Sequence, residues 1–141
     1  MKELPGDVFV TGQLLAAQIQ ALNEQGVMGF INNRPDMEGP LQPLSEELEA
    51  AAQSFGVDYQ HIPMSGGLTP GLIEASVTAF ETLPRPIVAF CASGMRSAAL
   101  WAFAHVDKLG VDGVMDAVSS IGFNLEQIRG PLTEFKNRSS A

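Results

Sequence analysis

The chain has 141 residues, of which 45% are hydrophobic and 17% are charged, which is the composition of one globular domain. Its net charge of −8 disfavours broad binding to nucleic acid or to an anionic membrane, and no apolar run approaches the length of a membrane span. A single cysteine excludes an internal disulfide, and the two histidines are too far apart for metal-ligand spacing, so we expect no metal and no cofactor. The first residues lack the apolar core of a signal peptide, which favours a reducing, cytoplasmic location.

Short apolar runs alternate with amphipathic stretches along the chain. We expect strands near residues 7–10, 27–32, 57–62 and 87–90, with the third near a sheet edge. The helical periodicity predicts helices near 15–25, 45–55, 70–80, 97–106, 114–121 and 125–135, with breaks at Gly110 and near Gly130 and Pro131. We therefore predict one α/β domain over residues 1–141, with a mainly parallel four- to five-stranded sheet flanked by helices and a frayed tail from about residue 136.

One stretch concentrates the candidate chemistry, and it begins where the last predicted strand ends. Apolar residues 87–90 lead to Cys91, a loop of small residues follows, and Arg96 stands at the start of the next helix. Successive backbone N–H groups of such a turn point at one spot, and the helix dipole adds partial positive charge there. Because an anion binds well in this position and a thiol there ionises more easily, we predict that Cys91 is a nucleophile in an anion-binding loop.

Two other loops are expected to reach the same place. Ligands of a parallel sheet bind beyond the carboxyl ends of its strands, and segments 33–40 and 64–68 follow two of the other predicted strands. In the first segment, Arg34 could contact an anion or form an ion pair with Asp36 or Glu38. The sequence thus predicts that these loops and the Cys91 loop meet in one site.

Three segments, in this order and at this spacing, resemble a known bacterial family. They are Phe30–Asp36 (FINNRPD), Gly56–Pro63 (GVDYQHIP) and Cys91–Ser97 (CASGMRS). Together they are similar to the phosphatase-like domain of beta-lactamase hydrolase-like proteins, a domain of unknown function that is similar in fold to dual-specificity and tyrosine phosphatases. The resemblance runs from about residue 8 to residue 123.

The resemblance implies a two-step hydrolysis of a small anionic phosphoester. The thiolate of Cys91 would attack phosphorus to form a phosphocysteine, and Ser97 would hydrogen-bond the sulfur when it leaves. Backbone N–H groups and the Arg96 guanidinium would hold the phosphate oxygens. The anion-binding residues implied in this way are Ala92, Ser93, Gly94, Met95 and Arg96, with Arg34 as a further candidate.

The sequence departs from the pattern of those phosphatases at three points. Four residues separate Cys91 from Arg96 where the phosphatases have five, and Phe90 replaces their histidine. Their general acid usually lies in the loop that corresponds to 64–68, which contains no carboxylic acid here. We predict Asp36 as the substitute acid, with Glu38 as a second candidate. A structural role for either carboxylate, in a turn or a helix cap, remains an equal alternative.

The shorter loop opens a second interpretation. The pattern Cys-x-Ser-Gly-x-Arg-Ser is similar to the active loop of single-domain rhodaneses, which would make Cys91 a persulfide carrier in sulfur transfer. The long helical stretch after Ser97 is unlike that class and favours the phosphatase-like fold. A third interpretation is a non-catalytic anion-binding module. The sequence leaves the oligomeric state open.

Overall fold

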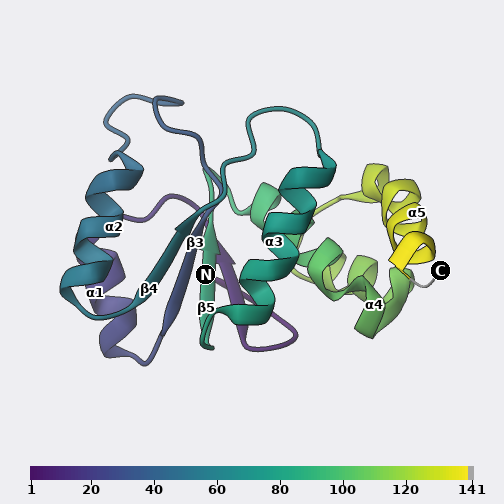
Figure 1. The fold of residues 1–141 in the computed structure, drawn as a ribbon, viewed down its shortest axis with the longest axis horizontal. Coiled ribbons are helices and arrows are strands. Elements are labelled where there is room, and N and C mark those ends of the chain that lie inside the picture. The colour runs from purple at the N-terminus through teal and green to yellow at the C-terminus, as the bar shows by residue number, and fades with distance from the viewer. Residues whose placement is uncertain (140–141) are drawn as a thin grey trace.

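A computed structural model describes residues 1–139, and its five strands form one sheet in the order β1-β2-β5-β3-β4 (Figure 1). The first strand is antiparallel to the second, and the other neighbouring pairs are parallel. The predicted mainly parallel sheet is therefore confirmed, with the strand from residue 58 at one edge. The strands are β1 (Lys2–Leu4), β2 (Val8–Thr11), β3 (Gly29–Asn32), β4 (Asp58–His61) and β5 (Ile87–Phe90).

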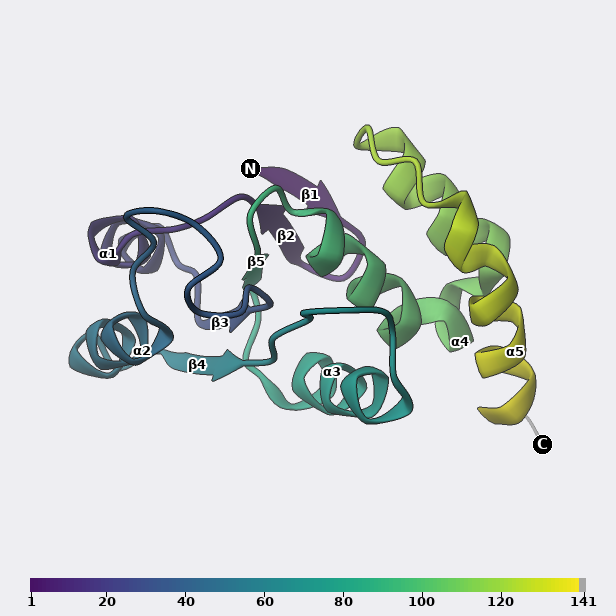
Figure 2. The same cartoon turned by 90° about the horizontal axis from the view of Figure 1, so that it is seen from above.

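Helices cover both faces of the sheet (Figure 2). They are α1 (Ala16–Glu24), α2 (Ser45–Ser54), α3 (Pro70–Thr82), α4 (Met95–Ser120), the 3₁₀ turn η1 (Glu126–Ile128) and α5 (Arg129–Ser139). In the view from above, α1 and α2 lie on one side of the sheet, α3 and α4 lie on the other, and α5 packs outside α4. Among the described residues, no helix combines the length and the apolar composition needed to cross a membrane.

The central strand β5 supplies both cores, because its side chains alternate between the two faces of the sheet. Ile87 and Ala89 belong to the core under α3, α4 and α5, whereas Val88 and Phe90 belong to the core under α1 and α2. All four residues are fully buried, as a near-continuous apolar run between two helical layers requires. The fold thus holds the start of the Cys91 loop rigidly.

The strand register brings the candidate loops to one edge of the sheet. Phe90, the last residue of β5, is level with Thr11 of β2 and Asn32 of β3, and Asn32 is level with His61 of β4. The loops that follow these strands therefore start side by side.

The structure corrects the predicted elements in several places. The antiparallel edge strand β1 was not predicted, and its turn into β2 uses positive φ angles at Gly6 and Asp7. The predicted break at Gly110, by contrast, is confirmed: the backbone of α4 is non-helical at that glycine, with φ +76°, and the helix is kinked there. The expected break near Gly130 and Pro131 is wrong, because both residues lie in the first turn of α5, where proline is tolerated. Helix α5 ends at Ser139, and the frayed tail expected from about residue 136 stays a prediction, since residues 140–141 lie outside the described part.

Candidate active site

The loop between β5 and α4 is built around Gly94. This glycine caps α4 with φ +97°, a conformation that favours glycine, and a Cβ atom there would lie 3.4 Å from the backbone of Thr11 and from the ring of Phe123. The loop turns tightly enough that the Gly94 N–H donates to the sulfur of Cys91 at 3.1 Å. The sulfur therefore lies over the N-terminal end of α4, where backbone N–H groups converge.

The environment of the Cys91 thiol favours its thiolate form. Burial works to raise the pKa of the thiol, since the residue is fully buried. Against this, backbone N–H groups of Ser97, Ser93 and Gly94 and the hydroxyl of Ser97 donate to the sulfur and lower its pKa. The donors outweigh burial, so the pKa of Cys91 lies below its ordinary value. A lowered pKa makes the thiolate, which is the nucleophilic form of cysteine, more accessible.

The hydroxyl of Ser97 has a second acceptor. Its Oγ donates to Oδ1 of Asn33 at 2.8 Å, and both residues are buried. Asn33 is itself fixed, because its Nδ2 donates to the carbonyl of Ile62 at 2.9 Å and its N–H donates to the carbonyl of Phe90 at 2.7 Å. The hydroxyl of Ser97 has one proton, which it donates to Asn33 here, and the sulfur of Cys91 is its alternative acceptor.

Arg96 joins the three predicted loops. Its Nη1 and Nη2 donate to Oε2 and Oε1 of Glu38 at 2.7 and 2.8 Å, a two-pronged ion pair. Nη1 also donates to the carbonyl of Met64 at 2.8 Å. Hydrogen bonding between the guanidinium and Cys91 contributes to raising the pKa of Arg96, behind the larger effect of Glu38. The expected meeting of the 33–40, 64–68 and Cys91 loops is confirmed.

A second guanidinium shares the carboxylate of Glu38. Arg34 donates from Nε to Oε1 of Glu38 at 3.1 Å and from Nη1 to Oε1 of Gln13 at 3.1 Å. Chiefly through the hydrogen bond from Arg96, and with a further contribution from Arg34, the pKa of Glu38 falls to about 2. Glu38 is therefore ionised at neutral pH.

The other predicted site residues, Asp36, Ala92, Ser93 and Met95, do not contact the Arg96–Glu38 pair in the hydrogen bonds described above. Oδ1 of Asp36 accepts from the backbone N–H of Ser45 at 2.8 Å, at the first residue of α2. Ala92 and Ser93 are exposed, and Met95 is 40% exposed. Asp36 thus contacts the start of α2, while its neighbour Glu38 contacts Arg96.

Sequence reasoning did not foresee three contacts of the site. The pairing of Glu38 with Arg96 spans 58 residues, and the bond from Ser97 to Asn33 spans 64. The contact of Gln13 with Arg34 depends on the β2–α1 loop, which turns back toward the Cys91 loop at Gly12, where a Cβ atom would lie 2.9 Å from the carbonyl of Ala92. The sequence does show polar residues after the parallel strands, which predicts that they lie at one edge of the sheet. This pattern does not indicate which of their side chains are in contact.

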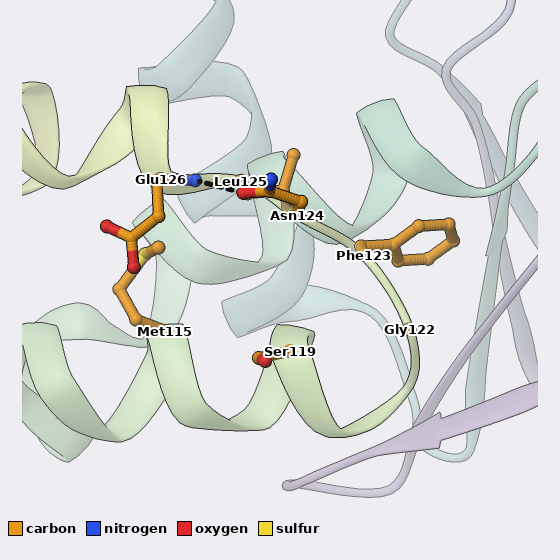
Figure 3. A pocket seen from close by; sticks show the side chains of 7 residues that line it. All are labelled: Met115, Ser119, Gly122, Phe123, Asn124, Leu125 and Glu126. Atoms are coloured by element: carbon orange, nitrogen blue, oxygen red, sulfur yellow. Dashed lines mark hydrogen bonds between the residues drawn. The ribbon is translucent and has the colours of Figure 1, made fainter.

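A separate cavity of about 300 Å³ lies beside the turn from α4 to η1 (Figure 3). Its lining residues are Met115, Ser119, Gly122, Phe123, Asn124, Leu125 and Glu126. One of its lining residues, Phe123, also approaches the Cys91 loop, since a Cβ atom placed on Gly94 would lie 3.4 Å from the ring of Phe123. None of the candidate catalytic residues lines it, and no group of three or more His, Cys, Asp or Glu side chains within residues 1–139 is arranged to hold a metal ion.

Known structures share this fold. A "putative phosphatase" of Neisseria meningitidis is 25% identical, with a TM-score of 0.79 over 95% of this chain and 96% of that chain. The core catalytic domain of the PP-IP phosphatase SIW14 of S. cerevisiae, solved in complex with citrate, is 15% identical, with a TM-score of 0.70 over 99% of this chain and 90% of that chain. The fold is thus that of the dual-specificity and tyrosine phosphatase class.

Sequence comparison gives a family. Beta-lactamase hydrolase-like proteins of Agrobacterium fabrum and Xylella fastidiosa are each 32% identical, over 82% and 80% of this chain. The matched part is 28% and 26% of their own length, so the chain spans about a quarter of these curated relatives. The family model for the beta-lactamase hydrolase-like protein, phosphatase-like domain, matches residues 1–107. The chain therefore belongs to this phosphatase-like domain family.

Proposed function

We propose that this domain is a cysteine-dependent phosphatase that hydrolyses a phosphoester of a small anionic substrate. The observation that carries the proposal is the Cys91 sulfur, with its lowered pKa, surrounded by backbone N–H donors and the Arg96 guanidinium at the start of α4. Membership of a phosphatase-like family and a fold shared with phosphatases support it. These donors suit a group that carries negative charge on several oxygens, as phosphate does.

In the first step, the thiolate of Cys91 attacks phosphorus, the S–P bond forms and the P–O bond to the alcohol breaks. The loop N–H groups of residues 92–96 and the Arg96 guanidinium hold the other phosphate oxygens as charge moves onto them. For this, the incoming phosphate must replace Glu38 on at least part of the Arg96 fork, since Glu38 engages both of its terminal nitrogens. The alkoxide that leaves takes a proton.

In the second step, water attacks phosphorus and the S–P bond breaks, so that inorganic phosphate leaves and the thiolate is restored. One proton of the water returns to the carboxylate that protonated the alcohol. The hydroxyl of Ser97 assists by turning its proton from Asn33 toward the sulfur, on which negative charge reappears. A hydrogen bond to the thiolate lowers the pKa of the leaving sulfur and therefore makes it a better leaving group.

For the proton that the alcohol takes, we propose Asp36 as the donor. Glu38 is ionised by its two guanidinium partners and holds no proton to give in this arrangement. Asp36 lies on the same loop two residues earlier, and one of its oxygens is bound by the Ser45 N–H, which leaves the other oxygen for a proton. The loop between β3 and α2 thus provides the acid that segment 64–68 lacks.

Phosphate release from 4-nitrophenyl phosphate tests the proposed function. We expect turnover by the wild-type protein, none above background by Cys91→Ser, and a phosphoryl adduct in intact mass spectra of acid-quenched protein. Arg129→Gln, which removes an exposed guanidinium paired with Glu126 and Asp112, is the matched control and should keep full activity. Absence of turnover and of the adduct would contradict the proposal. A one-sulfur adduct formed from thiosulfate would instead favour sulfur transfer, the alternative suggested by the short loop.

The role of Asp36 is tested by changing the leaving group. Asp36→Asn should lower kcat for phenyl phosphate by about 100-fold and flatten the pH profile of its turnover, because phenoxide needs a proton. The loss for 4-nitrophenyl phosphate should be much smaller, since 4-nitrophenoxide leaves readily without one. Asp112→Asn, which changes an exposed carboxylate on α4, is the control. Equal losses on both substrates would remove Asp36 from the role of proton donor.

A further inference from the structure

Two guanidinium groups converge on one carboxylate beside the Cys91 loop. Arg96 holds both oxygens of Glu38, and Arg34 holds Oε1 as well, although Arg34 lies in the loop after β3 and Arg96 lies in the first turn of α4. A carboxylate is an anion of nearly the size of one face of a phosphate group. Glu38 therefore marks a place where this site accommodates a negative charge next to the reacting centre.

The guanidinium of Arg34 is held in place by its neighbours. Its side chain is only 15% exposed, Nη1 donates to Gln13, and a Cβ atom on Gly39 would lie 2.7 Å from Nη2. Close packing and a fixed partner hold the guanidinium plane in one orientation, so little conformational freedom is lost when it binds an anion. The carboxylate between the arginines is more exposed, at 31% of its side chain, and lies in a surface loop.

The charges of the three side chains suggest which ligand can replace Glu38. A phosphoester with an uncharged alcohol supplies one anionic group, which takes the donors of Arg96 and leaves Glu38 to pair with Arg34. A substrate with a second anionic group near the ester oxygen can satisfy both guanidinium groups and release Glu38 to solvent. The domain as a whole carries a net charge of −8, so such a substrate depends on local cations for its attraction.

We propose that Arg34 forms a subsite for a second anionic group of the substrate, a carboxylate or a phosphate one or two carbon atoms from the reacting phosphate. The reaction of such a substrate rests on the proposed phosphatase function, whereas its binding does not. The contact of Arg34 with Gln13 positions the subsite, and Glu38 occupies it in the free protein.

Binding to the Cys91→Ser protein tests the subsite without turnover. Titration calorimetry compares ethyl phosphate with phosphoglycolate, in which a carboxylate replaces the methyl group, and with 1,2-ethanediol bisphosphate. We expect both doubly anionic ligands, or the one whose second group fits, to bind about tenfold more tightly than ethyl phosphate, the scale of one charged hydrogen-bonded contact. Equal affinities, or no binding of any of the three, would overturn the proposal.

The preference should depend on Arg34. In the Cys91→Ser background, Arg34→Gln should bring the affinities for phosphoglycolate and ethyl phosphate within about twofold of each other, and Arg34→Lys should keep part of the preference because it keeps the charge. Arg129→Gln is the matched control and should keep all of it. A preference that survives in a folded Arg34→Gln protein would refute the assignment.

Kinetics then separate the two proposals. If the preference appears in binding but no phosphoester is hydrolysed by the wild-type protein, the phosphatase function fails and the subsite stands. If 4-nitrophenyl phosphate is hydrolysed through Cys91 but phosphoglycolate has no advantage in kcat/KM or in binding, the subsite fails and the function stands.

Discussion

The hydroxyl of Ser97 has one proton and two acceptors, the amide oxygen of Asn33 and the sulfur of Cys91. In the proposed phosphatase cycle, this proton stabilises the thiolate before the first step and assists the departure of the same sulfur in the second. The amide of Asn33 is fixed by Ile62, so it offers the hydroxyl an alternative acceptor while the sulfur is bonded to phosphorus. One buried side chain can therefore act in both steps.

Ser97→Ala should raise the pKa of Cys91, because it removes one of the hydrogen bonds that favour the thiolate. A charged hydrogen bond of about 1.5 kcal/mol corresponds to a titration midpoint about one pH unit higher. Absorbance of the thiolate at ultraviolet wavelengths measures this directly, since the chain has one cysteine. The Cys91→Ser protein supplies the background, including Tyr59. An unchanged midpoint would show that the hydroxyl proton stays with Asn33.

The carboxylate of Glu38 competes with anionic ligands for the guanidinium of Arg96. With a pKa of about 2, lowered chiefly by the hydrogen bond from Arg96, it is charged at neutral pH. Glu38→Gln should therefore tighten the binding of inorganic phosphate about two- to fivefold near neutral pH, the effect of one partly exposed ion pair. Titration calorimetry measures it, with Glu126→Gln, at the exposed pair with Arg129, as the control. Weaker phosphate binding would instead mean that Glu38 positions Arg96.

At the scale of elements, periodicity and breakers identified the parallel strands and the main helices. Residues 87–90 were found because a strand covered on both faces is apolar throughout, and Thr69 and Pro70 marked the start of α3 through cap chemistry. Strand β1 has three residues and no alternation, so only its pairing with β2 makes it a strand. Pro131 was misjudged because its effect depends on its position within the turn.

In the candidate site, likewise, some residues could be predicted from local sequence and others could not. Cys91, Arg96 and Ser97 lie within seven successive residues, and their chemistry follows from the local strand, turn and helix. The contacts of Glu38 with Arg96 and of Asn33 with Ser97 depend on how the loop after β3 packs against the Cys91 loop. No local pattern encodes that packing, so the sequence predicted that the loops meet without predicting which side chains touch.

The kink in α4 depends on a backbone conformation that only glycine adopts readily. Gly110 has φ +76° and ψ 165°, with no atom within 4 Å of a Cβ placed on it, so a substitution would be strained without being crowded. Gly110→Ala should cost about 1–3 kcal/mol in the free energy of unfolding, measured with denaturant. Gly130→Ala, in helical α5 with open space, is the matched control and should be neutral or stabilising. Equal changes in the free energy of unfolding for the two variants would show that the kink does not depend on Gly110.

For the molecule as a whole, α5 extends the domain beyond the segment that defines its family. The family model ends at residue 107, inside α4, whereas the similarity in fold to the Neisseria protein covers 95% of the chain. Leu132 of α5 is fully buried in the same core as Trp101 and Phe80, and Phe135 packs edge-on against Phe103 at 5.7 Å between ring centroids. The helix is therefore part of the core that supports the start of α4 and the Cys91 loop.

Leu132→Ala tests whether this C-terminal layer and the site form one cooperative unit. Removing a fully buried leucine should lower the free energy of unfolding by about 2–5 kcal/mol, because the cavity forms in a continuous core. Denaturant unfolding followed by far-ultraviolet circular dichroism and by the fluorescence of Trp101 should give one coincident transition, with an unchanged slope. Thr133→Ala, at the exposed neighbouring position, should unfold like the wild type. If the two signals separate, with the helical signal lost first, α5 is an independent layer and the active loop does not depend on it for stability.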